Sequence, residues 1–334
     1  KTLNMTANVD LFPDFKIDLN ADRTYVDNYS EQYDVDPITN QYNSRSPYSF
    51  GNFSISTVML KTAFQTSDVN NSPAFEEMKS NRLIIANRLA ENYYGGGNIP
   101  RYGQGAYEIP ANTDDPNYAI YSANRGFPVG FGKNNQAVLL PSFLAAYTGL
   151  SGGGADKISL KAFRDIPIPN WTIKYSGLMR YKFFKDRFKR FSLQNSYKAS
   201  YTINAFRSNF EYDKAPTGYY TDPETNVTKP NVDAGGNFYN KTLISNINLV
   251  EQFNPLVRVD FELKNSIKFL AEMKKDRAMS MSFDNNLLTE VKGVEYILGL
   301  GYRIKDVIIS TRMADNPSGI IKSDINLKAD VSYR

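Results

Sequence analysis

The sequence predicts an all-β protein made of long antiparallel strands, with a helical insert near the middle of the chain. Hydrophobic and polar residues alternate with a period of two in many segments of the 334 residues, as they do along a strand with one dry and one wet face. The chain also contains 23 Tyr and 21 Phe, residues that favour strands. The alternation stops between residues 66 and 170, where helix signals replace it. These observations divide the chain into strands at 1–65, an insert at 66–170 and strands at 171–334.

The strands are expected where the alternation is clearest. In chain order these segments are 2–11, 15–25, 50–64, 171–181, 189–205, 239–252, 257–273, 278–288, 294–304 and 319–334. Tight turns are expected near residues 12–14, 253–255 and 274–277, and long polar connections at 26–49 and 212–238. Short turns on one rim and long loops on the other are typical of transmembrane barrels.

The segment 257–273 shows the two faces most clearly. Its odd positions are nearly all apolar and its even positions nearly all polar or charged. As one strand it would span about 55 Å, whereas strands in soluble domains are usually about 5 or 6 residues long. Either a very large soluble sheet covers the apolar side, or lipid does.

The insert carries signals for two helices. Ser72 and Pro73 precede Glu76, which is a good helix start, and three glycines from Gly95 end the pattern. A second helix is expected from Pro141 to Gly149, apolar nearly all round and therefore buried. The strands on either side, 50–64 and 171–181, need opposite directions. Either the insert hides another strand, or it crosses the space inside a barrel and acts as a plug or cap.

Composition excludes several functions. The chain has no His and no Cys, which removes the usual general base, the commonest metal ligand and the thiol nucleophile. We therefore expect no enzyme activity, no catalytic residue, no cofactor and no metal site. A net charge of +4 argues against nucleic acid as a partner. No window is apolar enough for a transmembrane helix. Alternation that continues up to Arg334 suggests a segment of a longer polypeptide.

A basic aromatic run, YKFFKDRFKRF at 181–191, connects two strands. Aromatic rings favour the head-group layer of a membrane, where cations meet anionic lipid, and a plain charged turn is the alternative. The candidate interfacial anchors in this run are Phe183, Phe184, Arg187, Phe188 and Arg190.

Three stretches together resemble one family. They are QAVLLPSFLAAYTGLS (136–151), FRDIPIPNWTIKYSGLMRYKFFK (163–185) and TEVKGVEYILGLGYRIKD (289–306). The chain resembles the C-terminal region of the SprA/Sov family, the outer-membrane translocon of the type IX secretion system, which also serves gliding motility in Bacteroidota. The resemblance implies a segment of a very large transmembrane antiparallel β-barrel that passes folded cargo proteins to the cell surface. It also implies outer-membrane lipid, secreted cargo, a PorV-like shuttle barrel and a periplasmic plug protein as partners.

The resemblance gives each strand face an environment. The residues expected to face the lumen are Asp260, Glu262, Lys264, Lys268, Lys322, Asp324, Asn326, Lys328 and Asp330. Those expected to face lipid are Val259, Phe261, Leu263, Ile267, Phe269, Ile325, Leu327 and Val331.

Two other functions remain open. One is a plugged outer-membrane nutrient transporter, and the other is a soluble secreted β-rich adhesin or carbohydrate-binding module. About ten strands enclose too little space for an insert the size of a small domain. We therefore expect the sheet to stay open, with both edges continued by further strands.

Overall fold

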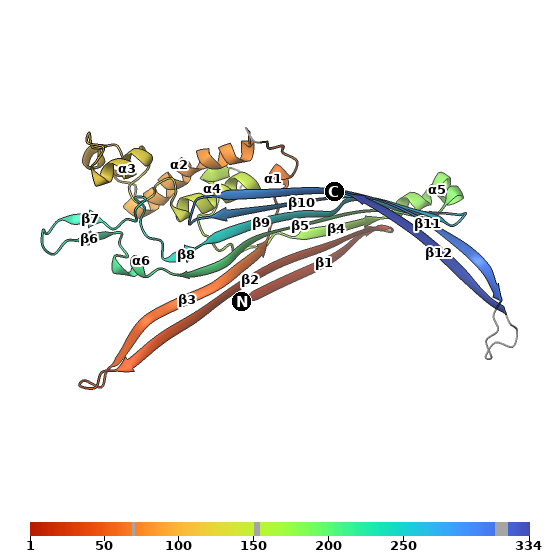
Figure 1. Ribbon diagram of the computed structural model, residues 1–334, viewed down its shortest axis with the longest axis horizontal. Coiled ribbons are helices and arrows are strands. Elements are labelled where there is room, and N and C mark those ends of the chain that lie inside the picture. The colour runs from red at the N-terminus through yellow and green to blue at the C-terminus, as the bar shows by residue number, and fades with distance from the viewer. Residues whose placement is uncertain (69–70, 150–153, 311–319) are drawn as a thin grey trace.

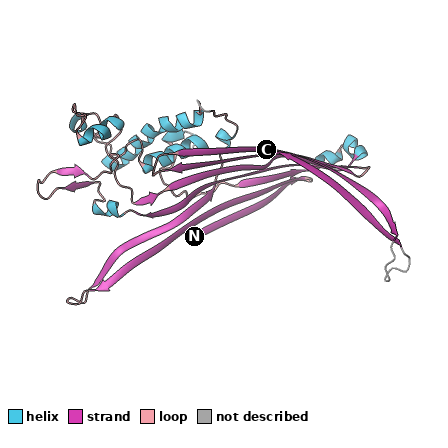
Figure 2. Ribbon diagram, in the orientation of Figure 1, coloured by secondary structure: helices cyan, strands magenta, loops and turns pink. Residues whose placement is uncertain are grey.

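The computed structural model describes residues 1–68, 71–149, 154–310 and 320–334. It shows one large antiparallel sheet, with most helices gathered at one end (Figures 1 and 2). The strands of this sheet are β1 (Thr2–Phe12), β2 (Phe15–Val35), β3 (Tyr42–Ser56), β4 (Asn170–Tyr175), β5 (Phe188–Ser208), β8 (Thr242–Ile244), β9 (Asn246–Leu263), β10 (Ile267–Ser282), β11 (Leu288–Ser310) and β12 (Ile320–Tyr333). The expectation of a mainly β, antiparallel fold is confirmed.

The sheet is open in the part of the chain that the structure describes. Its order is β1-β2-β3-β5-β9-β10-β11-β12, with β4 beside β2 and β5, and β8 beside β5. The two edge strands β1 and β12 do not pair with each other, as expected. A second, small sheet pairs β6 (Tyr219–Thr221) with β7 (Thr228–Pro230) in the long connection after β5.

The long strand predicted at 257–273 is in fact a hairpin. β9 ends at Leu263, residues 264–266 turn, and β10 begins at Ile267, so that Phe261 pairs with Phe269. The turn lacks Gly and Pro, and Ser266 takes the left-handed conformation (φ 68°) that closes a three-residue hairpin loop. The turns predicted at 253–255 and 274–277 are also wrong. Both lie inside strands, the first at a bulge of β9.

The insert interrupts a single strand. β3 lies between β2 and β5 and pairs with residues 23–35 of β2 and 200–207 of β5. β4 lies between the same two strands further along and pairs with residues 15–20 of β2 and 193–197 of β5. β3 with 15 residues and β4 with 6 together match the 21 residues of β2 and β5. The backbone N–H of Ile168 donates to the carbonyl of Ser56 at 3.0 Å, which brings the two ends of the insert together. β3 and β4 run in the same direction and act as one strand of the sheet. No strand is therefore missing inside the insert, and the insert need not cross a lumen.

The helices confirm the predicted signals and add others. α2 (Pro73–Tyr94) starts after Ser72 and ends at Gly95, whose φ of 73° suits glycine. α4 (Gln136–Thr148) begins five residues before Pro141 and is buried from Val138 to Thr148. The remaining helices are α1 (Leu60–Ala63), α3 (Pro116–Ala123), α5 (Lys182–Arg187), α6 (Phe210–Lys214) and the 3-10 turns η1 (Gly105–Tyr107), η2 (Gly154–Asp156) and η3 (Gly177–Arg180).

The hydrophobic core lies between the insert and one end of the sheet. Helices α2 and α4 pack on side chains of β3, β5, β9 and β10, whereas α5 lies at the opposite end, next to the turn of residues 177–180 (Figure 1). The largest buried strand residues in this core include Phe53, Tyr201, Ile203, Leu249 and Met279. The insert therefore covers only part of the strand length and leaves the rest of the sheet bare.

Candidate functional site

One face of the bare part of the sheet carries apolar side chains from every strand that reaches it. Residues directly opposite each other in an antiparallel pair have their side chains on the same face. The register aligns one residue from each of eight strands in a single row: Phe12, Phe15, Tyr175, Leu193, Val259, Ala271, Leu298 and Val331. We call this row and the apolar residues that continue it at alternate positions along the same strands, outside the part covered by the insert, the apolar band.

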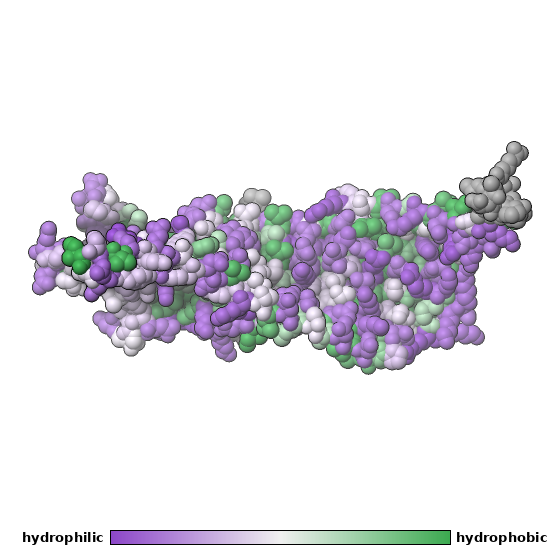
Figure 3. Space-filling view, turned by 90° about the horizontal axis from the view of Figure 1, so that it is seen from below, coloured by the Kyte–Doolittle hydropathy of each residue, from purple (hydrophilic) through white to green (hydrophobic). Residues whose placement is uncertain are grey.

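All the residues predicted to face lipid belong to the apolar band. Phe261 pairs with Phe269, Tyr302 with Leu327 and Ile304 with Ile325, so they share the face of the central row. Leu298 is 58% exposed and Val331 72% exposed. Figure 3 views the sheet from the side away from α2 and α4, where hydrophilic side chains predominate and apolar patches are scattered among them. Exposed apolar surface of this extent is typical of a contact with another protein or with lipid.

Aromatic side chains gather where the band meets the short turns. Phe184 of α5 lies 5.0 Å from Phe191, measured between ring centres, and Phe261 lies 5.0 Å from Phe269. The guanidinium of Arg187 stacks over the Phe183 ring at 4.5 Å. Of the predicted anchors, Phe183, Phe184, Arg187 and Phe188 lie in or next to α5. Arg190 instead lies on the opposite, polar face, paired with Asp260.

The opposite face is polar and carries alternating charges. Arg190 pairs with Asp260, Arg258 bridges Asp260 and Glu272, and Lys274 bridges Glu272 and Glu295. These pairs form one continuous chain across β5, β9, β10 and β11. Because most of these groups are at least partly exposed, each pair contributes at most about 1 kcal/mol to stability. Their main effect is to keep this face hydrated.

The residues predicted to face the lumen lie on this polar face, with one exception. Glu262 pairs with Lys268, Gly301 with Lys328 and Gly299 with Asp330 in the register. Asp324 forms an ion pair with Arg303, and Asn326 pairs with Arg303 in the register. Lys322 alternates with these residues on β12. The exception is Lys264, which lies in the turn between β9 and β10 and belongs to neither face.

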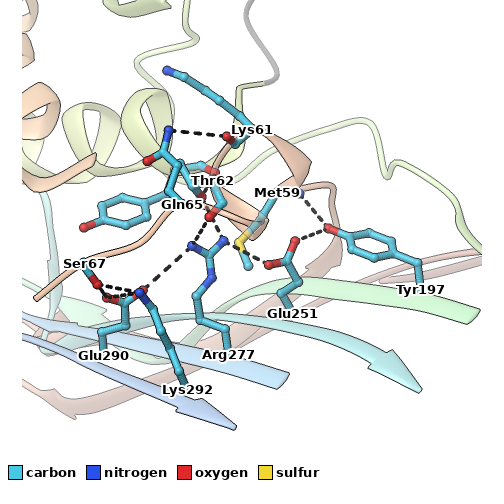
Figure 4. A network of polar contacts seen from close by, with 11 residues as sticks. Met59, Lys61, Thr62, Gln65, Ser67, Tyr197, Glu251, Arg277, Glu290 and Lys292 are labelled. Carbon is cyan, nitrogen blue, oxygen red and sulfur yellow. Dashed lines mark hydrogen bonds and ion pairs between the residues drawn. The ribbon is translucent and has the colours of Figure 1, made fainter. Parts of the chain in front are cut away.

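A buried polar network fixes the insert to the sheet. The guanidinium of Arg277 on β10 donates to the Thr62 carbonyl at 3.0 Å and to its hydroxyl at 2.8 Å, and pairs with Glu251 at 3.0 Å. The Tyr197 hydroxyl donates to Glu251 at 2.8 Å and accepts from the Met59 backbone N–H at 2.8 Å. Figure 4 shows Arg277 pointing toward Thr62, with Glu251 on one side and Glu290 on the other.

Burial governs the electrostatics of this network. The side chains of Arg277 and Glu251 are 4% and 3% exposed. Burial raises the pKa of the Glu251 carboxyl, and Arg277 and the Tyr197 hydroxyl act in the opposite direction. Breaking a buried ion pair leaves an uncompensated charge and is strongly destabilising. The network therefore holds α1 and the start of the insert on β5, β9 and β10.

Sequence reasoning missed these network residues because residues 274–277 were predicted to form a turn. The signal that could have found them is the parity of β10. Lys275, Arg277 and Met279 continue the odd positions of Phe269 and Met273 without a break, which one uninterrupted strand would show.

The insert and the apolar band lie on the same side of the sheet. β10 pairs with β11 from Ile267 to Met281 without a register shift, so Phe269 and Met279 share one face. Met279 is 1% exposed beneath the insert, whereas the neighbouring apolar band is bare. The polar face is therefore not the face on which the insert packs.

Neither a metal centre nor a relative explains these surfaces. Among the described residues no group of three or more His, Cys, Asp or Glu side chains could hold a metal ion, and no helix is long and apolar enough to cross a membrane. No model of a known protein family matches the chain, and no curated protein shows significant similarity to it. The two faces of the sheet are thus the features that indicate function.

Proposed function

We propose that this chain forms part of the wall of a protein-conducting channel in the outer membrane, as the resemblance to the SprA/Sov translocon family implies. In this proposal the apolar band faces lipid and the polar face lines the lumen through which folded cargo reaches the cell surface. The observation that carries the proposal is the apolar band itself, which runs across eight strand positions opposite a face of alternating charges.

The height of the band fits a bilayer. On β9, β10, β11 and β12 it extends over about seven to nine residues, which is about 23 to 30 Å at 3.3 Å per residue. Transmembrane barrels carry an outward apolar belt about 25 Å tall with aromatic residues at its borders. Phe184 and Phe188 lie at one border, and Tyr296 pairs with Tyr333 at the other.

The polar face suits a wide aqueous passage. Its charges alternate in sign, so the face has no field of one sign that would retain a passing protein. Folded hydrophilic cargo would meet a hydrated wall.

The open edges favour a barrel with more strands than this chain supplies. An unpaired strand edge in lipid leaves backbone groups without hydrogen bonds, at several kcal/mol for each group. In the proposed assembly β1 and β12 therefore pair with further strands.

The position of the insert counts against the plugged nutrient transporter. A plug fills the lumen and would contact the polar face, whereas this insert packs on the side of the apolar band. The strands that carry it continue past the band, so the insert would sit outside the barrel wall, beyond the bilayer.

A soluble adhesin or carbohydrate-binding module would have to leave the apolar band in water. Purification distinguishes the two simply, because a soluble module needs no detergent and a channel wall does.

Photo-crosslinking at two adjacent residues tests the channel. A photoreactive amino acid at Lys268 lies on the polar face, and the matched control at Phe269 lies in the apolar band. We expect the Lys268 position to capture secreted proteins during export and the Phe269 position to capture lipid. Absence of secreted proteins at Lys268, or equal capture at both positions, would contradict a channel with this orientation.

A further inference from the structure

A hollow of about 400 Å³ opens at the seam between the insert and the sheet, outside the apolar band. Its apolar lining comes from both sides of the seam and includes Ile55 and Tyr201 from strands, Leu144 from α4, and Phe163 and Ile168 from the segment that leads into β4. Ile166 at the same place is 81% exposed. Sites for small ligands are typically hollows of about 300 to 1,000 Å³ lined mainly by apolar side chains with few polar groups.

The one arginine in this lining, Arg164, has no counterion. Its backbone carbonyl accepts a hydrogen bond from the Arg23 guanidinium at 2.8 Å. Within the described part of the chain, however, its own guanidinium forms no hydrogen bond and lies within 4 Å of no carboxylate. Burial lowers the pKa of this guanidinium. The Arg164 side chain is half-buried, so its unpaired guanidinium is open to water and remains available to an anion that enters the hollow.

The charges around the hollow favour an anion. Arg23 lies 3.8 Å from Asp165, and Lys161 lies 3.4 Å from the same carboxylate. Asp165 therefore already interacts with two cations, is 66% exposed at the rim, and leaves Arg164 unmatched. The Tyr201 hydroxyl, which also lines the hollow, donates to the Ala162 carbonyl at 3.1 Å.

We propose that this hollow binds a carboxylate attached to an apolar chain, with the carboxylate on the Arg164 guanidinium and the chain against Ile55, Leu144 and Phe163. The planar guanidinium matches a carboxylate with two parallel hydrogen bonds, which a lysine would not reproduce. Such a group occurs in a short fatty acid and at the C-terminus of a polypeptide that ends in apolar residues. The site does not depend on the sheet lying in a membrane.

Calorimetric titration of the intact protein in amphipol, with matched acids and amides, tests the site. The probes are hexanoate against hexanamide, and an N-acetylated Leu-Ile-Leu peptide with a free C-terminus against its C-terminal amide. We expect at least one acid to bind about tenfold or more tightly than its amide, because the amide lacks the charge that Arg164 requires. The acid that binds identifies the source of the carboxylate.

Two variants locate the effect. Arg164→Met keeps the length and removes the charge, so the preference for the acid should vanish while the thermal midpoint stays the same or rises. Lys161→Met removes an exposed cation outside the hollow and should change binding less than about threefold. Two results would overturn the proposal: no preference for either acid, or a preference that persists in Arg164→Met. Fluorescence of Trp171, the single tryptophan, reports whether each variant is folded.

Discussion

The half of the sheet beneath the insert and the half that carries the apolar band use the same strands and the same face in opposite ways. Beneath the insert, that face contains charged and polar side chains such as Arg277, Glu251 and Tyr197, each with partners from the insert or from neighbouring strands. In the band, it contains only apolar and aromatic side chains, and Asn195 at the boundary is satisfied by Trp171 and the Leu256 carbonyl.

The presence or absence of charged side chains reflects the surroundings of each half of this face. A charge on a dry face is tolerated where protein supplies hydrogen bonds, as the insert does for Arg277. Where no protein covers the face, and lipid is the proposed neighbour, no group is present to pair with a charge. That part of the face accordingly carries no charged side chains. Period-two patterning is common to both halves, so the polar exceptions separate the part of the strands that the insert covers from the bare part that we propose faces lipid.

The largest expected effect comes from breaking the network beneath the insert. Glu251→Ala leaves the Arg277 guanidinium in the core with Glu290, 3.8 Å away, as its nearest carboxylate. We expect a loss of roughly 3 to 5 kcal/mol in the free energy of unfolding, measured by denaturant titration in detergent.

The double variant Glu251→Leu with Arg277→Met is the control for that loss. Removing both charges should recover most of the stability, since apolar residues of similar size replace a buried ion pair at little cost. A double variant as unstable as Glu251→Ala would show that the ion pair is not the reason.

A second, slightly smaller effect separates lipid from water at the band. Val331 is 72% exposed in the structure, so in a soluble protein Val331→Arg would change stability by less than about 0.5 kcal/mol. Near the middle of a bilayer the same change costs roughly 2 to 4 kcal/mol. We expect the larger value for refolding into lipid vesicles, and almost no effect from Ser332→Arg on the opposite face of the same strand.

A third comparison sets two tyrosines against each other. Tyr197→Phe removes the hydroxyl that serves both Glu251 and the Met59 N–H, so we expect a loss of about 1 to 3 kcal/mol. Tyr296 is 49% exposed in the band, and its hydroxyl has no hydrogen bond among the described residues. Tyr296→Phe should therefore change the unfolding free energy by less than about 0.5 kcal/mol, and equal losses would contradict the assignment of the two halves.

Sequence alternation grouped all but Lys264 of the residues predicted to face lipid or the lumen by the side of the sheet that they share, but it misplaced the strand ends, for one physical reason. Alternation records the side on which a residue points and not the direction of the chain. Phe261 and Phe269 are an even number of residues apart and pair across the hairpin, so the odd positions keep one face through the turn. The turn at 264–266 uses Ser266 where glycine would have signalled it.

The insert was predictable in its helices but not in its attachment. Ser72, Pro73 and Gly95 act locally and mark α2 correctly. The continuation of β3 by β4 depends on pairing with β2 and β5, and Arg277 lies 215 residues from its partner Thr62. Such contacts are set by tertiary structure, which no local pattern contains.

A spin-label scan along β10 tests most directly whether one half of this face is covered by the insert and the other half faces lipid. The chain has no native cysteine, so single cysteines from residue 267 to 281 can each carry one nitroxide. In lipid vesicles, we predict that odd positions 267–273 are accessible to oxygen dissolved in the bilayer, odd positions 277–281 to neither oxygen nor a water-soluble nickel complex, and even positions to the nickel complex. Odd positions 267–273 that are open to the nickel complex instead would contradict the account, because the apolar band would then face water.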